Sequence, residues 1–202
     1  MGLSAIIILN DSETAYNGNG TDGQKSGNNQ VKTLVIVGAV QFLESHSYFQ
    51  VFLKRVELAQ LSGVNYDEVD GVLDATILSL ERAKDTYDDL KNLAGNISYD
   101  LAVIEKLKVF DYDGFREENN DFNPLVFQEV NGFLSSGDVT GSYNKMFTDI
   151  TNILERLRSL KQGIYDNTFP QISIIWELNQ KYSNALFFGQ YVAMIFKVIQ
   201  NR

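Results

Sequence analysis

Apolar residues recur in steps of three and four along four long segments of this chain, residues 31–61, 66–94, 138–162 and 169–200. Positions three or four apart lie on one face of an α-helix, so each segment is predicted to be an amphipathic helix. The fourth segment differs because residues 185–199 are apolar on nearly every face. A helix of that kind must be surrounded by protein or lipid.

Helix-ending residues lie between these segments. Gly63, Gly95 and Gly163 follow the first three segments, and glycine adopts the left-handed conformation that commonly ends a helix. Asn65 followed by Glu68 resembles a capping box at the start of the second segment. Only two prolines occur in 202 residues, which suits long uninterrupted helices.

Two short helices are expected between the second and third long segments, over residues 99–110 and 123–134. Asn123 can cap the second of them and Pro124 suits its first position, while Gly137 follows its end. Residues 111–121 are expected to form a polar loop. The fold prediction is all-α, an up-and-down antiparallel bundle of four long helices with two short helices inserted between the second and third.

The N-terminal part has a different composition. Residues 10–30 are rich in Gly, Asn, Ser, Thr and Asp, which is typical of a linker. The apolar run 3–9 is too short to span a bilayer. We therefore interpret residues 1–30 as a flexible arm or the remnant of an export signal, and residues 31–202 as one domain.

Charge and composition narrow the range of functions. A net charge of −9 repels phosphate backbones, so nucleic-acid binding is not expected. The absence of cysteine removes thiol catalysis and Cys-ligated metal sites. It also favours a periplasmic or secreted location, with the cytoplasm as the alternative. No cofactor is predicted.

Val40 and other apolar residues widen the apolar face of the first segment, as expected for a helix with two neighbours. His46 is the only histidine and falls on the same face. A hydrogen-bonded core or boundary histidine is the ordinary interpretation. The alternative is a general base, which would need a partner acid or nucleophile, and no local motif supplies one. The chain also lacks Glu-x-x-His, which carboxylate-bridged di-iron bundles use.

The expected loop 111–121 is rich in oxygen ligands. Its acidic residues include Asp111, Asp113, Glu117 and Asp121. Calcium favours carboxylates on flexible loops, but an EF-hand needs glycine at its sixth position, and Gly114 is at the fourth. The segment is therefore either a solvated acidic loop or a cation site.

The last segment carries two further sets of candidate residues. The predicted contacts for a ligand or partner are the aromatic residues Trp176, Tyr182, Phe187, Phe188 and Tyr191. The small residues Ala185, Gly189 and Ala193 are spaced four apart, so another helix can approach them closely. They predict a tight helix crossing inside the domain or a homodimer seam.

The sequence therefore predicts a non-enzymatic helical bundle that binds a partner protein or a small ligand through its helices. One alternative is a membrane-active protein that inserts its apolar last helix, although the lack of a basic face does not favour it. The other is an enzyme with an unrecognised site near His46.

Overall fold

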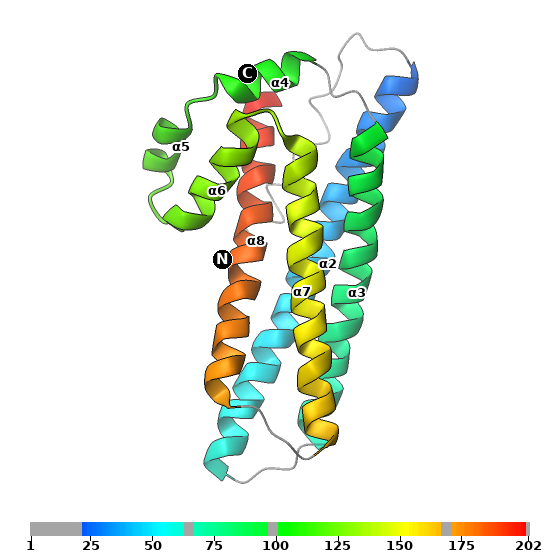
Figure 1. Cartoon of the computed structure of the whole chain (residues 1–202), viewed down its shortest axis with the longest axis vertical. Helices are drawn as coiled ribbons and strands as arrows, with labels where there is room; N and C mark the ends of the chain where they lie inside the picture. The colour runs from blue at the N-terminus through cyan, green and yellow to red at the C-terminus, as the bar shows by residue number, and fades with distance from the viewer. Residues whose placement is uncertain (1–21, 63–66, 97–100, 167–170, 201–202) are drawn as a thin grey trace.

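The computed structural model describes residues 22–62, 67–96, 101–166 and 171–200, and all regular structure within them is helical (Figure 1). The described part of the chain contains seven helices: α2 (Asp22–Ser62), α3 (Asp67–Asn96), α4 (Leu101–Lys108), α5 (Tyr112–Glu118), α6 (Pro124–Ser135), α7 (Val139–Tyr165) and α8 (Ile172–Gln200).

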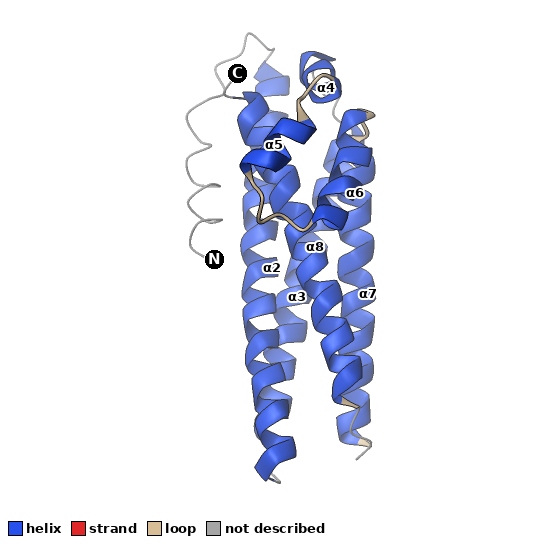
Figure 2. Cartoon of the chain, turned by 90° about the vertical axis from the view of Figure 1, so that its left-hand side faces the viewer, coloured by secondary structure: helices blue, strands red, loops and turns tan. Residues whose placement is uncertain are grey.

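The four long helices α2, α3, α7 and α8 lie side by side (Figures 1 and 2). Helix α3 packs against α2 and α7, and α8 also packs against α2 and α7. The short helices α4, α5 and α6 gather near the C-terminal end of α8. Each long helix therefore has two long neighbours.

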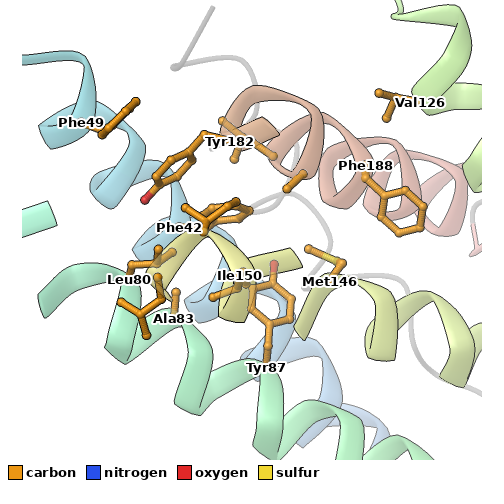
Figure 3. Close-up of a cluster of buried hydrophobic side chains, with 14 of the residues drawn as sticks. Phe42, Phe49, Leu80, Ala83, Tyr87, Val126, Met146, Ile150, Tyr182 and Phe188 are labelled. Carbon is orange, nitrogen blue, oxygen red and sulfur yellow. The ribbon is translucent and has the colours of Figure 1, made fainter. Parts of the chain in front are cut away.

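Aromatic and branched side chains from all four long helices fill the core. Phe42 and Phe49 come from α2, Leu80 from α3, Ile150 from α7 and Tyr182 from α8 (Figure 3). All five are almost completely buried. Burial of such large side chains is the main favourable contribution to folding.

Polar side chains link neighbouring long helices. The pairs are Ser45–Thr76 and Gln41–Thr86 between α2 and α3, Glu81–Arg158 and Asp74–Lys161 between α3 and α7, and His46–Ser183 and Gln50–Asn179 between α2 and α8. The two ion pairs are partly exposed, so they contribute little to stability.

The short helices explain why the C-terminal half of α8 is apolar on nearly every face. Helix α8 contacts α4 and α6 as well as α2 and α7. Val192 and Ile195 are buried there, whereas Ile174 and Trp176 near the start of α8 are exposed. None of the described helices combines the length and the apolar character needed to cross a membrane.

The helix ends around α6 and α7 follow the sequence prediction. The Asn123 side chain accepts hydrogen bonds from the backbone N–H groups of Leu125 and Val126, and Pro124 occupies the first turn. Gly137 follows α6 with a φ of 80°, a conformation that favours glycine. Asp138 caps α7 by accepting from the Gly141 N–H.

The expectation of a loop over residues 111–121 is wrong, because α5 occupies most of that segment. Asp111 caps this helix, accepting a hydrogen bond from the backbone N–H of Gly114 at 3.0 Å. Tyr112 is buried, and its hydroxyl donates to the carbonyl of Leu107. Three short helices, rather than the two predicted, therefore separate α3 from α7.

Three predicted boundaries also need correction. Helix α3 continues through Gly95 to Asn96. Helix α2 begins at Asp22, so residues 22–30 are helical despite their linker-like composition; once a helix is nucleated, each added residue gains a backbone hydrogen bond. Helix α7 continues through Gly163 to Tyr165, and Asp166 caps it instead. The proposed capping residue Asn65 and the apolar run 3–9 lie outside the described residues.

Candidate functional site

The five predicted contact residues of α8 do not gather on one surface. Tyr182, Phe188 and Tyr191 are buried, Phe187 is half-buried, and only Trp176 is well exposed, at 54%. Phe188 packs edge-on against Phe133 of α6 and lies beneath the ammonium group of Lys145. Most of the aromatic set therefore belongs to the core.

Tyr191 holds the connection between α5 and α6. Its ring stacks on Phe122 with centroids 4.1 Å apart, and its hydroxyl accepts a hydrogen bond from the Asn123 N–H at 2.8 Å. The pKa of this hydroxyl is raised overall. Burial and the nearby negative charge of Asp121 raise it, and the hydrogen bond from Asn123 partly opposes them. The ring of Phe187 stacks on the same tyrosine. These contacts fasten the short helices onto α8.

The small residues of α8 serve helix packing where the structure places them. Ala185 is buried. A Cβ atom at Gly189 would overlap the Cε of Met146 in α7, and it would lie 3.8 Å from the hydroxyl of Tyr87 in α3. Gly189 therefore faces the interior of this chain, while Ala193 is half-buried.

The acidic residues of segment 111–121 do not converge on a point. Asp111 is engaged as the cap of α5, and Asp113, Glu117 and Asp121 are exposed. Within the described ranges, no three His, Cys, Asp or Glu side chains are placed so that they could hold a metal ion. The geometry gives the cation interpretation no cluster of ligands.

His46 belongs to a polar cluster between α2 and α8. Its Nε2 lies 3.1 Å from Nε2 of Gln50 and 3.4 Å from Oγ of Ser183. An amide nitrogen can only donate, so Nε2 of His46 is the acceptor and the ring proton is on Nδ1. Gln50 also donates to Oδ1 of Asn179. Burial lowers the pKa of His46, which favours this neutral form.

A second part of the polar cluster is fully buried beside His46. The hydroxyl of Ser45 donates to the carbonyl of Thr76 at 2.8 Å, so the short contact between Ser45 and Tyr182 is donated by the tyrosine. Burial raises the pKa of Tyr182, which keeps its hydroxyl protonated and able to donate. The ring of Tyr182 also lies 5.2 Å from the ring of His46. The cluster joins three long helices.

The geometry of His46 resembles a structural bridge more than an activated nucleophile. A neutral imidazole offers one acceptor lone pair, and the shorter contact to it comes from Gln50 rather than Ser183. A base that activates a serine is itself usually oriented by a third group. Within the described ranges, no carboxylate contacts His46. The enzyme alternative therefore stays a prediction.

The outer face of α2 carries large apolar side chains that the core does not cover. Val37 and Val40 are each 40% exposed, Tyr48 38%, Val51 45% and Leu58 55%. Glu44 and Arg55 share this face and are also exposed. We call these seven residues the α2 outer stripe. At 1.5 Å per residue it is about 32 Å long.

No protein-family model, curated protein or solved structure matches this chain.

Sequence reasoning missed the α2 outer stripe because it assigned Val40 to a widened buried face. The signal is nevertheless present: Val37, Val51 and Leu58 occur at multiples of seven residues, with Glu44 completing the series. A seven-residue repeat keeps side chains on one face of a helix. Residues of α2 are apolar on two faces, and periodicity alone does not say which face lies inward.

Proposed function

We propose that the chain is a non-catalytic helical bundle that binds a protein partner through the α2 outer stripe. The main support for this proposal is the alignment of five exposed large apolar side chains along one helix face. Among the side chains that the structure describes, the other exposed large apolar ones are dispersed over α3, α7, α8 and the short-helix region, for example Leu78, Val109 and Leu125. Scattered residues are ordinary, whereas a continuous apolar row is typical of an interaction surface.

The chemistry of the stripe favours a protein over a nucleic acid or a small ligand. Its length and helical spacing suit a second helix laid along it, with side chains engaged every three or four residues. Glu44 and Arg55 supply opposite charges within the apolar row, and such charges can select the partner and its orientation. The net charge of −9 opposes attraction to phosphate backbones.

We also propose that the four long helices form an up-and-down antiparallel bundle. The order of the cross-helix pairs supports this arrangement. Between α2 and α3, Ser45 pairs with Thr76 whereas the earlier Gln41 pairs with the later Thr86. The α3–α7 pairs and the α2–α8 pairs reverse in the same way. Such an arrangement presents α2 as one corner of the bundle and leaves the large side chains of its outer face exposed.

Site-specific photo-crosslinking tests the proposed surface. A photoreactive amino acid replaces Val51 in the full chain, and the matched control carries it at Leu78, an exposed apolar position on α3. We expect a discrete cross-linked product of higher mass from position 51 in cells that express the chain naturally, and none from position 78. Equal labelling at both positions, or no product from position 51, would overturn the proposal.

A further inference from the structure

We propose that the partner is a second copy of this chain, with the two α2 helices packed antiparallel along their outer stripes. This inference rests on the proposed function, because it uses the same surface. It goes further by naming the occupant and the register. Charged and apolar positions are distributed in matching order on the two sides of the middle of the α2 outer stripe.

The charges of the stripe are self-complementary. Glu44 and Arg55 lie equally far, in residues, from the point midway between positions 49 and 50. A two-fold axis through that point places Glu44 of each copy opposite Arg55 of the other. Because one two-fold operation creates both contacts, the interface gains two opposite-charge pairs from one chain sequence. Both side chains are exposed, and Glu44 also accepts a hydrogen bond from the Tyr48 hydroxyl within the stripe, at 3.4 Å.

Four of the five apolar residues follow the same symmetry. Tyr48 and Val51 are also equally far from the midpoint, so each faces the other across the axis in the two copies. Val40 comes opposite Leu58 to within one residue. The centre of the pair is therefore apolar, the charged contacts flank it, and further apolar contacts lie outside them. This order is common in antiparallel helix pairs, where charges fix the register.

A parallel pair fits less well. Two copies aligned in the same direction would bring Glu44 against Glu44 and Arg55 against Arg55. Like charges facing each other across an interface are unfavourable and act against that arrangement. The antiparallel register replaces both repulsions by attractions without moving any residue out of the stripe.

The size of the surface sets the expected strength. A strip about 32 Å long and about 10 Å wide covers roughly 300 Å² per copy, below the roughly 800 Å² per partner of a standard stable interface. Each copy also carries a net charge of −9, which opposes association at low salt. The dimer should therefore be weak and reversible, and it should form at high micromolar concentration in the presence of physiological salt.

Charge reversal of the full chain tests the register by sedimentation equilibrium. Glu44→Arg alone places arginine opposite arginine, and Arg55→Glu alone places glutamate opposite glutamate. Each variant should therefore dimerise about tenfold more weakly than the original chain or worse, since two pairs change sign. An equimolar mixture of the two variants restores both opposite-charge pairs, so it should dimerise like the original chain. In a parallel dimer neither single reversal would weaken association, because each only exchanges one like-charge pair for another, and the mixture would associate more strongly than the original chain.

The control reverses an exposed charge on another helix. Glu155→Arg in α7 changes the net charge by the same amount as Glu44→Arg and lies outside the stripe. It should leave dimerisation as strong as in the original chain or slightly stronger. If Glu155→Arg weakens the dimer as much as Glu44→Arg does, or if the mixture stays monomeric, the antiparallel register is wrong. An original chain that stays monomeric at the highest concentration overturns the dimer itself.

The mass of the photo-crosslinked product separates this inference from the proposed function. A product from position 51 with twice the chain mass supports both. A product that contains a different protein leaves the proposed function standing and overturns the dimer. A cross-link from position 51 that closes within one chain, or the absence of any product, overturns both.

Discussion

Alanine at Phe188 should destabilise the fold severely, although this residue was predicted from the sequence as a binding contact. Its side chain is 1% exposed and packs against Phe133 and the ammonium group of Lys145. Full burial of a phenylalanine removes roughly 200 Å² from water, worth about 5 kcal/mol at 25 cal/mol per Å². Measured truncations of this kind cost about 3–5 kcal/mol. We expect a loss in that range.

Trp176→Ala is the matched comparison, because it truncates another aromatic residue of the same helix. Trp176 keeps 54% of its surface in solvent, so less than half of the transfer energy is at stake and the loss should be about 1–2 kcal/mol. Urea unfolding followed by circular dichroism reports both variants without relying on the single tryptophan. A Phe188→Ala variant that loses no more stability than Trp176→Ala would refute the assignment of Phe188 to the core.

Three further predictions concern the polar cluster and a helix end. The pKa of His46 is lowered in the folded chain, so the unfolded chain binds the proton more readily. The free energy of unfolding should therefore fall as the pH drops below about 6.5. In urea unfolding measured over a series of pH values, His46→Gln should remove that part of the loss. Tyr182→Phe should cost about 1 kcal/mol. Ser45→Ala should cost more, up to about 3 kcal/mol, because it leaves the buried tyrosine hydroxyl without its acceptor. Equal losses in urea unfolding would contradict the assignment of Tyr182 as the donor. Gly137→Ala should cost about 1–2 kcal/mol because of the positive φ at this position and the close approach of the Ile104 side chain. Gly132 faces open space, so Gly132→Ala should be neutral or stabilising by up to about 1 kcal/mol. Thermal unfolding compares the two variants.

The helical class and most helix positions could be predicted because they depend on local signals. Apolar spacing located the four long helices, and the Asn123–Pro124 pair marked the start of α6. Helix α5 was missed because its acidic composition suggested a solvated loop. What orders that segment includes non-local packing, such as the ring of Phe115 against Phe122 and Phe127.

The candidate site was harder to predict, since exposure depends on which neighbours a helix acquires. Helix α8 was chosen for its aromatic residues, yet four other helices contact it and bury Tyr182 and Phe188. Helix α2 was taken to have a broad buried face, and one edge of that face holds Val40, which is exposed. Composition shows that a helix has more than one apolar face, but only the assembled fold shows which face is uncovered.

Single-cysteine labelling tests whether the α2 outer stripe is a binding surface, and the chain contains no cysteine of its own. Val51→Cys places a thiol in the α2 outer stripe, Leu78→Cys is the exposed control, and Val192→Cys is the buried control. In dilute solution, the thiol at position 51 should react with a thiol-specific reagent about as fast as the thiol at position 78 and much faster than the thiol at position 192. At high micromolar concentration, position 51 alone should become protected. Slow labelling of position 51 in dilute solution, or equal labelling of positions 51 and 78 at every concentration, would contradict the account.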